Sequence, residues 1–374
     1  MWSADLQVRI MIMSGPGGPR SEEHERAWRP AVRQECGIFA PVDATRAVNA
    51  YSGVRTSILV GVAMLVSPAA MADESGVSFW LLGTYASQAA VPSDPGLSID
   101  MTYYSAGATA GRSASFARGG RIEVGLDTAS NYILLTPTWT FEPKVLGGQA
   151  SFGVTALWGN YASTVSATLV APSGRSLSGA LGDSMTAFGD LFPTATLKWN
   201  SGVNNFMTYL TANVPVGTYD VNRQATVGMG RWAIDGGLGY TYFHEDKGLE
   251  FSAVAGLTYN FMNPHTAYQS GIDLHVEVSA SQYLTERFLA GATGYFYQQI
   301  TADSGPGATL GPFISRVAGV GPQLGYDFAH GHRSVSISAR GYYEFAGQNR
   351  PQGFAAWLTF VVSLGVPGHK PAAP

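Results

Sequence analysis

Residues 249–261 read Leu-Glu-Phe-Ser-Ala-Val-Ala-Gly-Leu-Thr-Tyr-Asn-Phe, and their side chains alternate between two kinds. Every odd position from Leu249 to Phe261 is apolar, whereas the positions between them include Glu250, Ser252 and Asn260. Successive side chains of a β-strand point to opposite faces of the sheet. The stretch therefore predicts a strand with one oily face and one wet face.

The same period of two dominates the chain from about residue 130 onward, as in residues 271–283 and 334–345. A soluble β-sandwich would show this alternation too. Many of the segments run for 11–15 residues, whereas soluble strands have about 5–6 residues and tilted membrane strands about 9–11. The length favours a membrane barrel, with strands expected near 130–142, 149–159, 186–199, 204–214, 231–243, 249–262, 271–283, 286–300, 314–328, 334–345 and 354–364.

The connections between these strands alternate in length. The short ones are expected at 142–148, 200–203, 244–248, 284–285 and 329–333, and the long ones at 160–185, 215–230, 263–270, 301–313 and 346–353. Short periplasmic turns and long outer loops are the organisation of outer-membrane barrels. Because short and long connections alternate in this order, the last strand ends on the side of the short turns, which is the periplasmic side.

Both termini lie in the periplasm only if the number of strands is even. A twelfth strand is therefore expected near 97–105, with 106–129 as another outer loop. Residues 77–87 also have the pattern of a strand. Either that segment lies in the lumen or the periplasm, or the total is fourteen. The predicted fold is all-β, a transmembrane antiparallel up-and-down β-barrel of about 12 strands, with 14 as the alternative.

The first part of the chain has the layout of an exported precursor. Arg55 precedes a short apolar run over residues 56–66, and small residues follow at Ala70 and Ala72. This is the pattern of a secretory signal peptide, and the run is too short for a membrane-spanning helix, which needs about 20 residues. We expect residues 1–54 to be an untranslated or non-structural leader, 55–72 the signal peptide cleaved near Ala72, 73–364 the barrel and 365–374 a flexible tail.

Composition narrows the classes of function. Charged residues make up 13% of the chain and aromatic residues 12%, as a barrel wall with one apolar face requires. The formal net charge is −4 and there is no basic tract, so nucleic acid is not an expected partner. The one cysteine, Cys36, falls in the expected leader, which leaves no disulfide or thiolate chemistry for the barrel.

Alternation places a set of charged side chains on the wet face of the strands. A charge on the lipid face would cost about 2–4 kcal/mol near the bilayer midplane, so these residues are expected in the lumen. They could form a mixed-charge lining that orients a solute, or fill a narrow lumen with mutual ion pairs, and both can hold at once. The pore-lining candidates are Lys198, Arg231, Asp235, Glu250, Asp273, His275, Glu277, Arg340 and Glu344.

Four polar residues, Asp273, His275, Glu277 and Ser279, share one face of the expected strand 271–283. Neighbours in this set are roughly 7 Å apart, whereas a catalytic nucleophile must touch its base. One histidine and two carboxylates also lack the converging ligands of a metal site. We therefore expect no catalytic residues, no metal and no cofactor. The loop 301–313 could fold into the pore as a constriction or remain outside, and the sequence leaves that open.

A family resemblance extends these expectations. Its motifs include Gly189-Asp190-Leu191-Phe192-Pro193, Val214-Pro215-Val216-Gly217-Thr218-Tyr219-Asp220 and Gly294-Tyr295-Phe296-Tyr297-Gln298-Gln299. These resemble the outer-membrane proteins named after the meta-pathway of phenol degradation, densely from about 186 to 364. The family is described as transporters for aromatic and other hydrophobic compounds, so the resemblance implies a membrane channel. One departure is that the last strand is followed by Gly365 and a Pro/Ala-rich tail, rather than ending on the aromatic residue that the assembly machinery reads.

The sequence thus predicts a channel for passive uptake of small hydrophobic or aromatic compounds across the bacterial outer membrane. Its expected partners are outer-membrane lipid, a small solute and the barrel-assembly machinery. Two alternatives stay open: an outer-membrane hydrolase that uses lumen residues, and a structural or adhesive barrel with a plugged lumen.

Overall fold

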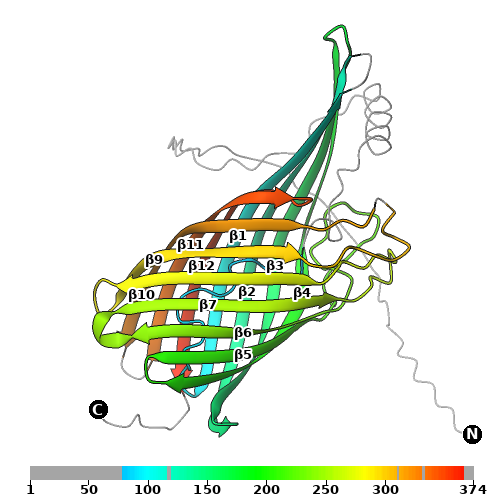
Figure 1. The fold of residues 1–374 in the computed structure, drawn as a ribbon. Coiled ribbons are helices and arrows are strands. Elements are labelled where there is room, and N and C mark those ends of the chain that lie inside the picture. Colours follow the sequence, from blue (N-terminus) through cyan, green and yellow to red (C-terminus); the bar gives the residue numbers. More distant parts are fainter. Residues whose placement is uncertain (1–77, 116–118, 310, 331–332, 366–374) are drawn as a thin grey trace, which may run out of the picture. The chain divides into compact units, whose positions relative to one another are not determined.

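The computed structural model describes residues 78–115, 119–309, 311–330 and 333–365. In this part of the chain twelve strands form one closed antiparallel barrel (Figure 1). Each strand pairs with its neighbours in sequence, and the first strand pairs with the last. The strands are β1 Gly96–Ser115, β2 Arg121–Val145, β3 Gly148–Val170, β4 Ser176–Ser201, β5 Asn204–Asn213, β6 Ala233–His244, β7 Leu249–Asn260, β8 Asp273–Tyr283, β9 Phe288–Gln299, β10 Arg316–His330, β11 Arg333–Gln348 and β12 Gln352–Gly365.

The prediction of a twelve-stranded barrel is confirmed. The only helix in the described ranges is the 3-10 turn η2, Glu245–Lys247, between β6 and β7. No described helix has both the length and the apolar character of a membrane span. Residues 78–87, which had the pattern of a strand, form turns inside the barrel instead, so the first of the two alternatives for this segment is correct.

Three of the predicted outer loops are wrong. Most of residues 106–129 and 160–185 belong to β1, β2, β3 and β4, since β1 continues to Ser115, β2 begins at Arg121, β3 continues to Val170 and β4 begins at Ser176. Residues 346–353 likewise form the ends of β11 and β12 around a short turn. The loops over 214–232, 261–272 and 300–315 are long, as expected. The many Ser, Ala and Gly residues of 106–129 and 160–185 contribute to these errors, because they weaken the contrast between the two faces.

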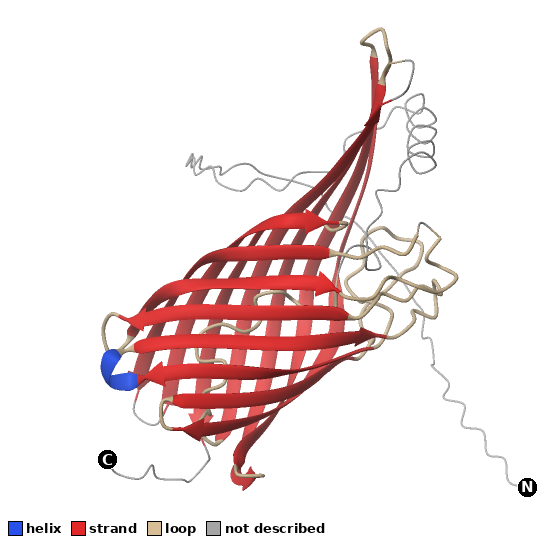
Figure 2. Ribbon diagram, in the orientation of Figure 1, coloured by secondary structure: helices blue, strands red, loops and turns tan. Residues whose placement is uncertain are grey.

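The long strands form what we call the β1–β4 extension, a four-stranded sheet over residues 106–115, 121–131, 160–170 and 176–187. Figure 2 shows it rising beyond the remaining strands. β12 pairs with β1 only as far as Thr109, and β5 pairs with β4 only from Thr194. The extension therefore has no strand neighbours at its two edges beyond those points.

The two faces of the barrel wall differ as the alternation predicted. On β7, Leu249, Phe251, Leu257 and Tyr259 are exposed, whereas Glu250 and Ser252 are buried. The exposed set forms an apolar outer band, as a surface in lipid requires. Apolar side chains of the same band come from the other strands, including Met101, Ile133, Leu135, Trp139, Phe152, Trp158, Phe206, Leu238, Val278, Phe296, Leu324, Tyr343, Leu358 and Phe360.

Candidate functional site

The barrel is not empty. Residues 78–95, here called the lumenal segment, run through the interior before the chain enters β1. Its aromatic rings pack on rings of the wall: the Phe79 and Phe192 centroids are 5.8 Å apart, and those of Tyr85 and Tyr209 are 5.2 Å apart. Burial raises the pKa of Tyr85, and the nearby charges of Glu277 and Asp235 add to the effect. Its phenol therefore stays neutral and does not bring another charge into the lumen.

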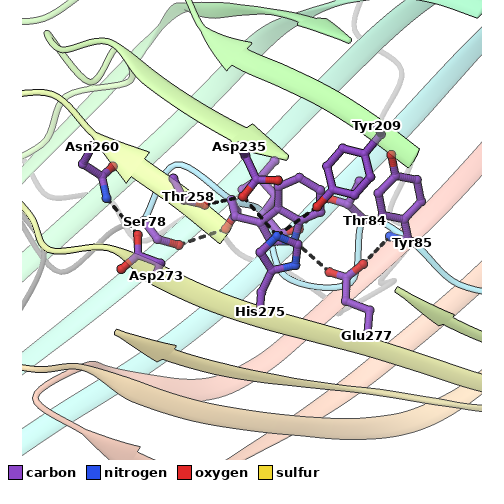
Figure 3. Close-up of polar contacts among 12 residues, drawn as sticks. Ser78, Thr84, Tyr85, Tyr209, Asp235, Thr258, Asn260, Asp273, His275 and Glu277 are labelled. Carbon is purple, nitrogen blue, oxygen red and sulfur yellow. Dashed lines mark hydrogen bonds and ion pairs between the residues drawn. The ribbon is translucent and has the colours of Figure 1, made fainter. Parts of the chain in front are cut away.

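Glu277 of β8 is the main anchor of this segment. Its Oε1 accepts hydrogen bonds from the Trp80 Nε1–H (2.9 Å) and the Gly83 N–H (2.8 Å), and its Oε2 accepts one from the Tyr85 N–H (2.6 Å) (Figure 3). The side chain is 2% exposed. A buried carboxylate is costly unless donors surround it, and here three donors of the lumenal segment supply that need.

Glu250 of β7 plays the same part farther along the segment. Its carboxylate accepts hydrogen bonds from the Ser87 hydroxyl (2.8 Å) and the Gln88 N–H (2.9 Å). Gln323 of β10 donates to the same Ser87 hydroxyl (2.7 Å). Two carboxylates on neighbouring strands therefore hold successive turns of one segment.

Two cations of the wall bind carbonyl oxygens of the segment. The Arg340 guanidinium donates to the Gly83 carbonyl (2.8 Å), and the Lys198 ammonium donates to the Val91 carbonyl (3.1 Å). The lumenal segment lacks the hydrogen-bond ladder of a strand, and its buried backbone groups need partners from elsewhere. Arg340 also lies 5.1 Å from the ring centroid of Trp357.

His275 stands at the centre of the buried polar network on β6–β8. Its ring stacks on Trp80 with centroids 4.0 Å apart. Its Nε2 lies 3.1 Å from Asp235 Oδ2 and 3.2 Å from the Tyr209 hydroxyl (Figure 3). Asp235 also accepts a hydrogen bond from Thr258 (2.5 Å). The histidine supports the wall and one ring of the lumenal segment.

The other three candidates bind the barrel itself. Asp273 accepts a hydrogen bond from Asn260 (2.8 Å), and Glu344 accepts hydrogen bonds from the Tyr295 hydroxyl (2.7 Å) and the Gly353 N–H (2.9 Å). Arg231, just before β6, is buried, and its carbonyl accepts a hydrogen bond from Asn213 (2.7 Å). The structure thus places all nine candidates at interior positions, but it distributes them between the segment and the wall.

The arrangement offers little to a reaction at His275. The Ser279 hydroxyl, on the same face of β8, has no hydrogen-bond partner among the described residues, and the histidine contacts an aspartate and a tyrosine instead. Within the described ranges, no group of three or more His, Cys, Asp or Glu side chains could hold a metal ion.

A cavity of about 490 Å³ lies between the lumenal segment and the wall, where residues of β1–β5 and β9–β12 border it. Phe79, Trp80 and Tyr85 face it from the segment, and Phe192 and Trp357 from the wall. Two of the nine candidates, Lys198 and Arg340, border it. The rest of the wall is rich in hydroxyl groups, from Ser98, Thr102, Thr136, Thr138, Thr140, Ser151, Thr155, Thr194, Thr196, Thr211, Ser338 and Thr359.

Asp100, which is not among the nine candidates, also lines the cavity. Its Oδ1 is buried and has no hydrogen-bond partner in the part of the chain that the structure describes, so it offers an acceptor to a bound molecule. The signal was present, because residues 97–105 were a predicted strand and period two puts Asp100 on the wet face with Ser98 and Thr102.

The loop 214–232 packs on the barrel wall next to the cavity. Its Ala225 is fully buried in an apolar cluster with Tyr132, Leu134, Leu157 and Tyr161, against which Val227 and Phe192 also pack. We call this group the outer apolar cluster. Leu134 and Phe192 border the cavity as well, so the cluster and the cavity are continuous.

Neither the loop 214–232 nor the described part of the loop 301–313 contributes a residue to the lining of this cavity. Asp303 in this loop accepts hydrogen bonds from the Tyr268 hydroxyl (2.5 Å) and the Gly271 N–H (3.1 Å). The loop is therefore held against its neighbour at 261–272.

Comparison with known proteins identifies a family for the chain and a solved structure with a similar fold. A family model described as "Putative MetA-pathway of phenol degradation" matches residues 111–360. The fold is similar to the COG4313 outer membrane channel from Pseudomonas putida F1, with a TM-score of 0.54 and 14% identity over 76% of this chain and 100% of that one.

Two further structures are more distant. A FadL homologue from Pseudomonas aeruginosa gives a TM-score of 0.32 at 11% identity, covering 71% of this chain and 89% of that one. CdiB from Acinetobacter baumannii gives 0.32 at 9% identity, covering 71% and 60%. No curated protein matches the chain.

Proposed function

The chain belongs to the family of the MetA-pathway of phenol degradation, and on this premise we propose that it is an outer-membrane channel for passive uptake of small hydrophobic or aromatic compounds. Its strands form a closed barrel with an apolar outer band, which supports a place in the outer membrane. Export would follow from the predicted signal peptide cleaved near Ala72, which lies outside the described residues. N-terminal sequencing of the protein from outer membranes would check that cleavage site.

The observation that carries the proposal is the cavity beside the lumenal segment. Its volume of about 490 Å³ suits a molecule of one or two aromatic rings, since small-molecule sites span about 300–1,000 Å³. Phe79, Trp80 and Trp357 supply ring surface on which such a molecule can pack. The threonine hydroxyls and Asp100 on the opposite side can bond a polar substituent.

Entry of an apolar aromatic dye into intact cells tests this function. The lipopolysaccharide layer of a Gram-negative host excludes N-phenyl-1-naphthylamine, whose fluorescence rises when it reaches the membrane interior. Cells that express the chain should take up the dye severalfold faster than cells with an empty vector. Thr194→Trp, which fills the cavity from its lining, should return the rate toward the vector level.

The matched control is Ala195→Trp, because Ala195 is the next residue of β4 and is exposed on the opposite face. A tryptophan there meets lipid and should leave dye entry unchanged. Dye entry at the vector level in the wild type, with liposomes also impermeable to sugar-sized solutes, would overturn the channel and favour a structural barrel plugged by the lumenal segment.

A further inference from the structure

The β1–β4 extension reverses the polarity of the barrel wall. In the barrel, the face of these strands that lines the lumen carries Thr102, Thr136 and Thr155. Farther along the same strands, the same face becomes apolar. Its side chains there are Ala106, Ala108 and Ala110 of β1, Ile122, Val124 and Leu126 of β2, Val165, Ala167 and Leu169 of β3, and Leu177, Leu181 and Met185 of β4.

Strand register shows that these residues share one face. β1 and β2 pair without a shift from Gly96↔Thr140 to Ser115↔Arg121. β2 and β3 pair without a shift from Leu135↔Ala156 to Arg121↔Val170. Directly opposite residues of an antiparallel pair point to the same side, so Leu126, paired with Val165, lies on the lumen side. We call this surface the inner face of the extension.

The opposite face of the extension is polar. Arg121 and Glu123 form an ion pair of 2.6 Å there, and Thr168 donates to Ser178. Both of these pairs are exposed. A sheet that extends beyond the lipid needs polar residues where it contacts water, and the outer face of the extension has them. The large apolar side chains of the extension therefore lie mainly on the inner face.

Part of the inner face is open. Leu177 is 43% exposed and Leu181 is 46% exposed, whereas Ile122, Val124 and Ala167 are buried together with Leu169 packed against them. Exposed apolar surface of this kind marks a binding site in a soluble environment. Each Å² that an apolar ligand covers contributes about 25 cal/mol, so a small ligand can gain useful affinity here.

What lies next to this face indicates its occupant. Below Leu126 and Val165, the same face passes a polar row that includes Thr128, Ser163 and Asp183, to which the loop 214–232 is bonded. It then continues through Tyr132 and Tyr161 to Leu134, which borders the cavity. A protein partner would have no need of a surface that continues into the lumen, whereas a molecule that enters the cavity would need it. The occupant consistent with this continuity is a small apolar solute.

We propose that the inner face of the β1–β4 extension is a capture surface for small apolar solutes, and that the loop 214–232 separates it from the lumenal cavity. This inference rests on the proposed function. The loop is fastened to the inner face at Asp183, whose carboxylate accepts hydrogen bonds from Arg223 Nη2 (2.5 Å), the Gln224 N–H (3.1 Å) and the Ala225 N–H (3.0 Å). A solute on the inner face would meet the outer apolar cluster at Ala225. It would displace the loop 214–232, which carries Ala225, on its way into the cavity.

Single cysteines test the capture surface directly. The full chain has only Cys36, which is replaced by serine in both proteins. Leu181→Cys puts a thiol on the inner face. Ala180→Cys puts a thiol on the opposite, polar face of the same strand, and Ala180 is also exposed. Each protein in lipid nanodiscs is treated with a water-soluble maleimide, with and without naphthalene. Naphthalene should slow labelling severalfold at Leu181→Cys and leave Ala180→Cys unchanged.

A second measurement links capture to entry. Leu177→Thr with Leu181→Thr keeps β-forming side chains but removes most of the exposed apolar area of the inner face. It should slow dye entry into cells severalfold at low dye concentration. The difference should shrink at high concentration, because capture then ceases to limit the rate.

Three results would overturn the capture surface. These are equal effects of naphthalene at the two thiols, unchanged dye entry in the double variant, and efficient disulfide-linked dimers of Leu181→Cys, which would make the inner face an interface between copies. The proposed channel function would be contradicted by a different result, namely dye entry into cells with the wild-type chain at the rate of the empty vector.

Discussion

Glu277 shows how a single residue can decide the state of the lumen. Its carboxylate receives three hydrogen bonds from the lumenal segment and lies where water has little access. Hydrogen bonds to a buried charge contribute about 1.5–3 kcal/mol each. The position of the segment therefore depends on whether residue 277 can accept from all three donors at once.

Glu277→Gln should loosen the lumenal segment. The amide keeps one acceptor oxygen, and its NH2 group faces a donor, so at least one hydrogen bond is lost. A loss of about 2 kcal/mol would raise the ratio of displaced to seated segment roughly thirtyfold. Planar-bilayer recordings should show more frequent and larger open events.

The control for this change is Glu344→Gln. That carboxylate bonds Tyr295 and Gly353, so the same chemical change leaves the lumenal segment in place. Equal conductance in the two variants would mean that Glu277 does not hold the segment.

Some of this site could be predicted from sequence. Alternation put Glu250, Glu277, Lys198 and Arg340 in the interior, because period two is a property of the strand alone. Their partners could not be predicted, since Trp80 and Glu277 are 197 positions apart and the lumenal segment has no regular period that fixes its side chains. That the predicted residues line a pore stays a prediction, and only Lys198 and Arg340 border the cavity.

Among the elements, β4 organises the outer loop through two aspartates. Asp183 holds the tip of the loop 214–232, and Asp190 holds its base through Asn213 (2.9 Å), Gly217 N–H (2.8 Å) and Met229 N–H (2.9 Å). Gly217 lies so close to the backbone of Gly189 that a Cβ would come within 2.4 Å of it. The base of the loop is therefore tightly packed, and the tip depends on Asp183.

Asp183→Asn should free the tip of the loop. The amide loses the charge that attracts Arg223 and one of the oxygens that accept its hydrogen bonds. Trypsin should then cut after Arg223 faster than in the wild type, which a time course on gels measures. The control is Asp220→Asn, because the Asp220 carboxylate bonds Asn222 within the loop. This variant should be cut at the wild-type rate. Cleavage as fast as in Asp183→Asn would show that Asp183 does not hold the tip of the loop.

The existence of all twelve strands could be predicted from the sequence, but the lengths of β1 to β4 could not. β5 to β9 were placed within a few residues because strong apolar and polar contrast marks their ends. β1 to β4 were cut short because the oily side changes from the outer to the inner face near Tyr104 and Tyr132. Alternation of apolar and polar residues does not show which face of a strand meets lipid. The change of the apolar side from the outer to the inner face therefore resembles the end of a strand.

For the whole molecule, the reversal defines the height of the lipid-facing band. The outer face of β2 is apolar at Ile133, Leu135 and Trp139, and polar at Glu123 and Asp127. Leu135→Arg should therefore lower the free energy of unfolding by about 2–4 kcal/mol, the cost of a cation on lipid-facing strands. Urea titrations of the refolded protein in vesicles measure this value.

Ser166→Arg provides the comparison. Ser166 lies on the outer face of the extension, opposite Gly125, where the proposed orientation puts it in water. The substitution should change the folding free energy by well under about 1 kcal/mol. A large cost at both positions would place the extension inside the bilayer.

The pairing of β1 with β12 also has a consequence for how the barrel forms. Their register joins Leu97 to Gly365 and continues to Thr109 and Gln352, so the seam connects the strands most distant in sequence. Contacts of such long separation form late, because the chain between them must first be ordered. Until then two strand edges stay unpaired, which lipid tolerates poorly. Pairing of β12, the last fourteen residues of the sheet, with β1 is thus the step that closes the barrel and removes both free edges.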